Sequence, residues 1–259
     1  MVKLKEIKDY LENLVPLRDQ DSWDNSGIQV GDIESPIKKV GFALSVSLPV
    51  IEEAKKQKVN LIITHHPITI SGIKRFTPDE YPSLLVLKLV KENIAVYSLH
   101  TNLDVSPFGP TALIGKEISM KDTKPIVENP PYGLIGKVEE ISQEELLTKL
   151  LKFLPTDSFR LINYKPKQRV LKVAVCSGSG ASFIDIVAKE ADLFITGDVK
   201  YHDALKAQDL NLTVFDLGHF GTERLFYLQI KRLLEENFPS LDFCVLEEKS
   251  PFEVVNYAK

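Results

Sequence analysis

The histidines of this chain are few, and their placement predicts metal chemistry. The 259 residues include five histidines, at positions 65, 66, 100, 202 and 219. A carboxylate follows two of them at the same spacing: Asp104 lies four residues after His100, and Glu223 lies four residues after His219. Residues four apart are neighbours on a helix, so each pair is expected to share one helical face. Imidazole and carboxylate together suit zinc, iron, manganese or nickel, and need no cysteine.

The adjacent pair His65-His66 favours two ions over one. A single histidine near the end of a strand is more often a hydrogen-bonded packing residue than a ligand, and this alternative applies to each histidine taken alone. Neighbouring residues of a strand point to opposite sides, so this pair would not chelate one ion within a strand. Where the strand relaxes into a loop, before Pro67, each histidine can serve one of two neighbouring metals. The pattern therefore predicts a dinuclear site.

Alternating strands and helices are expected to position these side chains. Apolar runs with strand character occupy 39–44, 60–64, 94–99, 173–176, 192–196 and the residues from 213, and helical patterns occupy 1–15, 48–58, 81–92, 181–190 and the residues from 200. This alternation predicts parallel pairing in a sheet covered on both faces. The carboxyl ends of such strands line the crevice where ligands bind. All five histidines follow strands, with His202 just inside the helix that begins near Lys200.

The second part of the chain repeats the first. The segment 40–66 aligns with 173–198 at an offset of 132 or 133 residues, and 94–100 aligns with 213–219 at an offset of 119. Internal repeats of this kind indicate duplication. We predict a first α/β half, 1–124, and a second half, 125–259, with Pro125–Gly133 as the linker and the C-terminal segment packing back on the first half. The ligand candidates then divide between the halves.

Composition and charge exclude several classes of protein. Hydrophobic residues make up 44% of the chain and charged residues 26%, values typical of globular proteins. The net charge of −4 argues against a nucleic-acid partner, which normally requires a basic surface. Two cysteines, Cys176 and Cys244, fit a reducing compartment. The start lacks the apolar stretch of a signal peptide, and the longest apolar run, 84–90, is too short to cross a membrane, so we expect a cytoplasmic protein.

Two further features have both a structural and a functional interpretation, and two more are interpreted as structural. The loop Ser177–Gly180 is either a tight strand-to-helix turn or a phosphate cradle, and it lacks the lysine of a P-loop. Cys176 ends an apolar strand, which favours a buried, inert thiol over a nucleophile. Trp23 lies in a turn-rich loop that it could anchor by packing. The Lys/Glu-rich stretches 52–58, 137–149 and 231–236 are interpreted as solvated helix faces.

Five motifs together resemble one known family. They are W-D-N-x-G at 23–27, T-H-H-P at 64–67, H-T-N-L-D at 100–104, T-G-D at 196–198 and G-H-x-x-x-E at 218–223. In this order and at these spacings they resemble the GTP cyclohydrolase I type 2 homologues, also called the NIF-three-like or dinuclear-metal-centre family. The resemblance implies a duplicated three-layer α/β/α fold with mixed, mostly parallel sheets. It also implies a ring-shaped homohexamer, built as a trimer of dimers, and two metal ions between the halves.

The resemblance also implies roles for individual residues. The family's metal ligands fall on His65, His66, Asp104, His219 and Glu223, with Glu223 bridging both ions. His100 and His202 are not direct ligands in that pattern, and with Glu223 they are expected to act in catalysis. The family often has two adjacent histidines near His202, whereas this chain has Tyr201 in the first of those positions.

The expected function is hydrolysis of a nucleotide or related heterocycle by two divalent ions of zinc, iron, manganese or nickel, with no organic cofactor. The family label implies opening of the imidazole ring of GTP with release of formate. The alternative is a non-catalytic ring protein that stores or delivers metal or holds a protein partner. The extra polar residues His100, His202 and Asp198 favour the enzyme, because a storage site would not need them. Neither a membrane nor a nucleic acid is expected as a partner.

Overall fold

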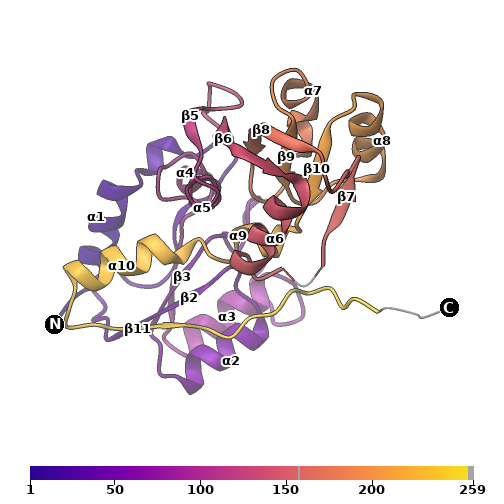
Figure 1. The fold of residues 1–259 in the computed structure, drawn as a ribbon. Coiled ribbons are helices and arrows are strands. Elements are labelled where there is room, and N and C mark those ends of the chain that lie inside the picture. The colour runs from indigo at the N-terminus through magenta and orange to yellow at the C-terminus, as the bar shows by residue number, and fades with distance from the viewer. Residues whose placement is uncertain (157, 256–259) are drawn as a thin grey trace. The chain divides into compact units, whose positions relative to one another are not determined.

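The computed structural model describes residues 1–156 and 158–255, and the chain divides into two units (Figure 1). The first unit combines Met1–Ser106 with Phe226–Lys249, and the second comprises Pro107–Leu225 with the segment that begins at Ser250. Each unit contains one β-sheet. The C-terminal part of the chain therefore returns to the unit formed by its N-terminal part.

The first sheet has five strands in the order β1-β4-β3-β2-β11. Its strands are β1 (Gly27–Val30), β2 (Lys39–Ala43), β3 (Leu61–Thr64), β4 (Ala95–Ser98) and β11 (Asp242–Val245). Strands β11, β2, β3 and β4 run parallel, and β1 is antiparallel to β4. The central strands β3 and β4 are buried along their whole length, as expected when helices cover both faces.

Helices cover both faces of this sheet. They are α1 (Leu4–Leu14), η1 (Leu17–Asp19), α2 (Leu48–Lys56), α3 (Ser83–Lys91), α4 (Thr101–Asp104) and α10 (Tyr227–Asn237). On one face, Ile62 and Val96 pack against α2 and α3 in a single apolar cluster. On the other face lie α1 and α10, which contact each other where the Tyr10 ring meets Phe238 at 5.6 Å between centroids (Figure 1). Phe42 of β2 contacts Tyr227 of α10 on that face.

The second sheet has six strands in the order β5-β6-β8-β9-β10-β7. They are β5 (Lys121–Lys124), β6 (Leu134–Ser142), β7 (Arg160–Ile162), β8 (Arg169–Val175), β9 (Leu193–Thr196) and β10 (Thr213–Asp216). Strands β8, β9 and β10 are parallel, and β5, β6 and β7 join the sheet by antiparallel pairing. The parallel character expected for both sheets is thus confined here to the three central strands.

Helices also cover both faces of the second sheet. They are α5 (Pro110–Glu117), α6 (Gln143–Phe153), η2 (Ala181–Phe183), α7 (Ile184–Val187), α8 (Tyr201–Asp209) and α9 (His219–Glu223). One apolar cluster joins α5 and α6 to the sheet, and another joins α7 and α8 to its opposite face. Helix α6 starts at a capping box, in which Ser142 accepts from the Glu145 N–H and Glu145 accepts from the Ser142 N–H.

The two units repeat one topology, which confirms the predicted duplicated three-layer α/β/α fold. In each, three parallel strands alternate with two helical segments: β2-α2-β3-α3-β4 in the first unit and β8-α7-β9-α8-β10 in the second. In each, the strand that precedes this series pairs antiparallel with its last strand, β1 with β4 and β7 with β10. The sequence offset therefore reflects equivalent positions in two copies of one architecture.

Several local expectations differ from the structure. The turn-rich loop that contains Trp23, expected over 19–36, includes β1, and residues 137–142 of a stretch interpreted as a helix face belong to β6. The helix expected over 181–190 is a 3₁₀ turn followed by the short α7. Pro125–Gly133 lies within the second unit, where Ile126 is buried against the sheet, instead of linking two units. The boundary between duplicated halves at 124/125 stays a prediction, whereas the contact units change over at Ser106/Pro107.

Across the part of the chain that the structure describes, no helix has both the length and the apolar character needed to cross a bilayer.

Helix α10 belongs to the first unit, so its buried side chains should contribute to the stability of the protein. Ile230 of α10 is fully buried, so Ile230→Ala should reduce the free energy of unfolding by about 2–5 kcal/mol through lost burial and a cavity. Leu228, on the same helix and 39% exposed, is the control, and Leu228→Ala should cost well under 1 kcal/mol. Urea denaturation measures both, and equal losses would contradict the assignment of α10 to this core.

Candidate metal centre

His65 occupies the point where β3 ends, and its surroundings fix the chemistry of its ring. The side chain is completely buried, and Nδ1 lies 2.7 Å from the backbone oxygen of Leu99. A carbonyl only accepts, so Nδ1 carries the proton and the lone pair of the neutral ring is on Nε2. That Nε2 lies 3.5 Å from Oδ1 of Asp104, the last residue of α4. The arrangement presents one imidazole nitrogen and one carboxylate oxygen side by side.

His66 lies beside His65 and is also held at Nδ1. The two rings are 5.1 Å apart between centroids, so both imidazoles lie on the same side of the strand end. Nδ1 of His66 lies 2.7 Å from Oγ of Ser45, which follows β2. The His66 carbonyl accepts hydrogen bonds from the hydroxyls of Thr64 and Ser98. The two imidazoles therefore lie close together at this strand end, and the service of each to a separate ion stays a prediction.

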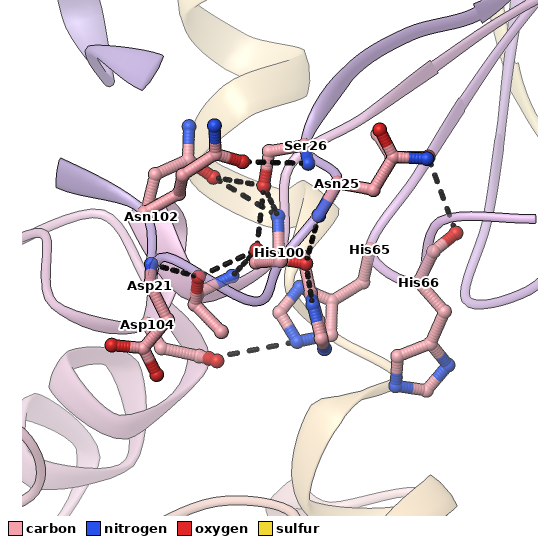
Figure 2. A network of polar contacts seen from close by, with 12 residues as sticks. Asp21, Asn25, Ser26, His65, His66, His100, Asn102 and Asp104 are labelled. Atoms are coloured by element: carbon pink, nitrogen blue, oxygen red, sulfur yellow. Dashed lines mark hydrogen bonds and ion pairs between the residues drawn. The ribbon is translucent and has the colours of Figure 1, made fainter. Parts of the chain in front are cut away.

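His100, at the start of α4, joins these two rings (Figure 2). Its ring centroid lies 5.3 Å from that of His65 and 5.6 Å from that of His66. The three residues offer ligand atoms that all lie within 4.8 Å of one another, a separation that one metal ion could span. His100 is predicted to act beside the ions, and its ring lies almost as near to those of His65 and His66 as these two rings lie to each other.

A buried carboxylate orients His100. Asp24 has a fully buried side chain whose Oδ1 accepts from Nδ1 of His100 at 2.7 Å. It also accepts from the N–H and hydroxyl of Thr101, the hydroxyl of Ser26 and the N–H of Asn25. Burial alone would raise its pKa, but the hydrogen bonds from His100 and Thr101 outweigh burial and hold the pKa of Asp24 well below its usual range. Asp24 is therefore ionised and fixes the His100 ring with Nδ1 toward it.

Trp23 precedes this carboxylate but is not a core residue. Its side chain is 54% exposed, and its ring meets the His100 ring edge-on at 6.0 Å. The loop is instead fastened through Asp24 and through Asn25, whose side-chain amide donates to the Thr69 carbonyl at 2.8 Å. The W-D-N motif thus anchors the loop by its two polar residues, with the indole lying against His100.

The second unit contains a comparable imidazole–carboxylate arrangement. His219, the first residue of α9, has Nδ1 2.7 Å from Oδ2 of Asp198 and Nε2 2.8 Å from Oε2 of Glu223. The predicted helical face shared by His219 and Glu223 is confirmed. Asp198 follows β9 with a positive φ of 53°, a strained conformation that turns the chain there. The T-G-D motif thus supplies the acceptor for the His219 ring.

Electrostatics make His219 a strong base in the absence of metal. Burial lowers the pKa of His219, but the carboxylates of Glu223 and Asp198 outweigh burial and raise the pKa to about 9. A proton then stands between Nε2 and the Glu223 carboxylate, where a divalent cation would bind instead. Since a metal ligand must be the neutral imidazole, metal binding has to displace that proton.

The glycine loop after β8 packs against Glu223. Gly178 has a φ of 63°, and a Cβ there would lie 2.0 Å from Oε1 of Glu223, so no larger residue fits. The Gly178 N–H donates to the Thr222 hydroxyl at 2.9 Å. The loop Ser177–Gly180 is therefore a tight turn that lies close against this carboxylate. Cys176 is buried, in agreement with the prediction of an enclosed thiol.

His202 lies apart from these groups. It is exposed on α8, and its ring contacts that of its neighbour Tyr201 at 5.3 Å. Over residues 1–156 and 158–255, no group of three or more potential metal ligands includes His202. Its catalytic role stays a prediction.

The donor set in each unit fits a divalent transition metal. Imidazole Nε2 and carboxylate oxygen are the atoms that zinc, iron, manganese and nickel accept, and both units offer them. His65, His66 and His219 each have Nδ1 bonded to an oxygen, from Leu99, Ser45 and Asp198 respectively. Such partners fix the tautomer and aim of a ligating histidine. The Leu99 carbonyl, Ser45 and Thr222 could not be recognised from the sequence, because none of them stands in a recognisable motif.

Comparisons with known proteins agree with the motifs. The sequence model of the family described as Duf34/NIF3 (NGG1p interacting factor 3) matches residues 2–251. A Campylobacter jejuni protein named GTP cyclohydrolase 1 type 2 homolog is 36% identical over 255 residues, covering 97% of this chain and 99% of the relative. A Methanocaldococcus jannaschii protein of the same name is 34% identical over 249 residues, covering 93% and 100%. The solved structure of reduced HcgD from Methanocaldococcus jannaschii has a TM-score of 0.85 and 33% identity, covering 95% of this chain and 98% of its own.

The raised pKa of His219 predicts a pH dependence of the metal-free protein. In protein treated with a chelator, nuclear magnetic resonance should show His219 titrating near pH 9 instead of 6.5. A pKa raised by folding stabilises the fold fully below the unfolded value, and this contribution is lost as the pH rises from 6.5 to about 9. Glu223→Gln should lower the midpoint and shrink the pH-dependent part. A wild-type midpoint at or below 6.5 would contradict the assignment.

Proposed function

The chain belongs to the Duf34/NIF3 family, and from that premise we propose that it is a hydrolase with a dinuclear metal centre that acts on a nucleotide or a related heterocycle. One observation carries the proposal. In each unit, an imidazole whose Nδ1 is held by an oxygen presents Nε2 to a carboxylate, His65 to Asp104 at 3.5 Å and His219 to Glu223 at 2.8 Å. Two such ligand pairs, one in each unit, support two ions.

The proposed ligands are His65, His66 and Asp104 from the first unit and His219 and Glu223 from the second. Catalytic metal sites usually have three protein ligands for each ion. Five residues can supply two such sets only if one residue is shared, and a carboxylate with two oxygens can bridge. We therefore propose that Glu223 is the shared ligand.

When bound, two divalent ions would lower the pKa of a coordinated water molecule and stabilise the negative charge that develops on the substrate. The chain's own residues would prepare this chemistry. Asp104 and Glu223 contribute negative charge that neutral imidazoles lack. His100, held by Asp24 at Nδ1, directs its other ring nitrogen away from that carboxylate, where it can bond to a substrate or to a nucleophile. Asp198 keeps the His219 ring in one orientation when the proton on Nε2 is displaced.

The relatives' names support a purine nucleotide as the first substrate to test. The name GTP cyclohydrolase 1 type 2 homolog refers to ring opening of GTP, which is a hydrolytic reaction of a heterocycle. Three imidazoles lie close together in the first unit, and the second unit has the His219–Glu223 pair. These imidazole and carboxylate groups are donors suited to such a reaction. Assembly as a homohexameric trimer of dimers remains part of the proposal.

Loss of the bridging carboxylate should reduce both metal loading and turnover. We expect purified wild-type protein to contain close to two divalent ions per chain and Glu223→Ala to contain at most one, by elemental analysis. Hydrolysis of GTP, followed by formate release, should fall by at least about 100-fold in this variant. Asp209→Ala, at an exposed carboxylate of α8, is the matched control and should behave as wild type. Full metal loading of the wild type without turnover of any nucleotide would instead favour the storage or scaffold alternative.

The division of the histidines into ligands and non-ligands has its own test. His219→Ala should lose metal, whereas His100→Ala and His202→Ala should retain close to two ions per chain and lose turnover. The same elemental analysis and formate assay measure both properties. Equal metal loss in His100→Ala and His219→Ala would show that His100, which lies among the ligand imidazoles of the first unit, is itself a ligand.

A further inference from the structure

A carboxylate from the C-terminal segment reaches the chain beside His66. Glu248 follows β11 and accepts a hydrogen bond from the backbone N–H of Leu44 at 2.7 Å and from that of Ser45 at 3.0 Å. Each of its two oxygens takes one of these donors. Hydrogen bonds from amides to a charged carboxylate are stronger than those between neutral groups. Glu248 therefore fixes the position of a two-residue segment that lies about 200 residues earlier in the sequence.

The sheet explains why a side chain performs this task. Strand β11 pairs with β2 as far as Val245 and Phe42, and the Leu246 N–H then donates to the Phe42 carbonyl at 2.9 Å. Beyond this bond, the Glu248 carboxylate replaces the backbone as the acceptor for the next donors of the β2 chain. The Glu248 side chain, on the segment that follows β11, thus holds the residues that follow β2 in a fixed direction.

The segment held by Glu248 in turn holds His66 at two points. The backbone N–H of His66 donates to the Leu44 carbonyl at 3.0 Å. The Ser45 hydroxyl lies 2.7 Å from Nδ1 of the His66 ring. Both contacts come from the pair of residues whose amides Glu248 binds. A continuous series of hydrogen bonds therefore runs from Glu248 through Leu44 and Ser45 to the backbone and the ring of His66.

We propose that Glu248 is a positioning residue for His66: it sets Ser45 so that Ser45 holds Nδ1 and the ring presents Nε2 to the metal. The inference rests on the proposed function, because it takes His66 to be a metal ligand. The oxygen partner of a ligating histidine typically changes metal affinity 10–100-fold when removed. Glu248 acts less directly, because it fixes the position of Ser45, which is the oxygen partner of His66.

The same series couples metal binding to the C-terminal segment. If the placement of Ser45 favours metal at His66, then metal at His66 favours the placement of Ser45 and the docking of Glu248 by the same factor, since such coupling is reciprocal. Metal should therefore protect the Leu44 and Ser45 amides from hydrogen exchange. A merely structural role of Glu248 in closing the sheet would give no such response to metal.

The experiment measures metal affinity in four variants by isothermal titration with Mn²⁺, on chelator-treated full-length protein. Glu248→Ala and Ser45→Ala should each weaken one of the two sites about tenfold. Glu248→Gln, which keeps one acceptor oxygen, should show a smaller loss and keeps the test valid if Glu248→Ala does not fold. Glu247→Ala, at the exposed neighbouring carboxylate, is the control and should bind as wild type.

The double variant Glu248→Ala/Ser45→Ala separates positioning from general stability. If Glu248 acts on the metal through Ser45, the double variant should bind metal no more weakly than Ser45→Ala alone. Metal-dependent protection of the Leu44 amide should be present in wild type and absent in Glu248→Ala. Additive losses, or wild-type affinity in Glu248→Ala while the wild type holds two ions, would overturn this inference alone. A wild type that binds no metal would overturn the proposed function and this inference together.

Discussion

A ligating histidine keeps a defined orientation when its second ring nitrogen is hydrogen-bonded to an oxygen. The candidate metal centre depends on this interaction at each of its proposed histidine ligands. The Leu99 carbonyl holds His65, the Ser45 hydroxyl lies on His66, and the Asp198 carboxylate holds His219. Each partner is placed by the end of a parallel strand, where backbone groups leave the ladder and become available to side chains. The repeated three-strand arrangement is therefore the support on which the imidazoles are aimed.

Charge has to be accommodated beside these rings, because the carboxylates of Asp24 and Glu223 are buried. Asp24 is enclosed yet ionised, because hydrogen bonds from His100, Thr101, Ser26 and Asn25 replace the water that burial removes. In the second unit, Glu223 is almost fully buried and shares a proton with His219 in the absence of metal. The two carboxylates differ in purpose: Asp24 is saturated by protein donors and orients a ring, whereas Glu223 has its charge directed at the position where a cation is proposed.

The strands could be predicted from the sequence where burial on both faces requires a continuous run of apolar residues. Central strands such as Leu61–Thr64 and Leu193–Thr196 are buried on both faces, so they appear as continuous apolar runs. The strands that the sequence analysis missed are at the sheet edges or next to them. Strand β5 is exposed throughout, and β6 mixes exposed charged residues with buried apolar ones over its nine residues. Such strands are specified by pairing with a neighbour, and that information is not local.

The sequence by itself determined the residue types, the spacing of His219 and Glu223 on one helical face, and the strand ends that carry His65, His66 and His100. Those features depend on local periodicity, which a single chain displays directly. Only the tertiary structure decided that Leu99, Ser45 and Asp24 orient the rings and that Glu248 holds Ser45 from the far end of the chain. Hydrogen bonds between residues tens to hundreds of positions apart follow from sheet register and strand order, which no short segment encodes.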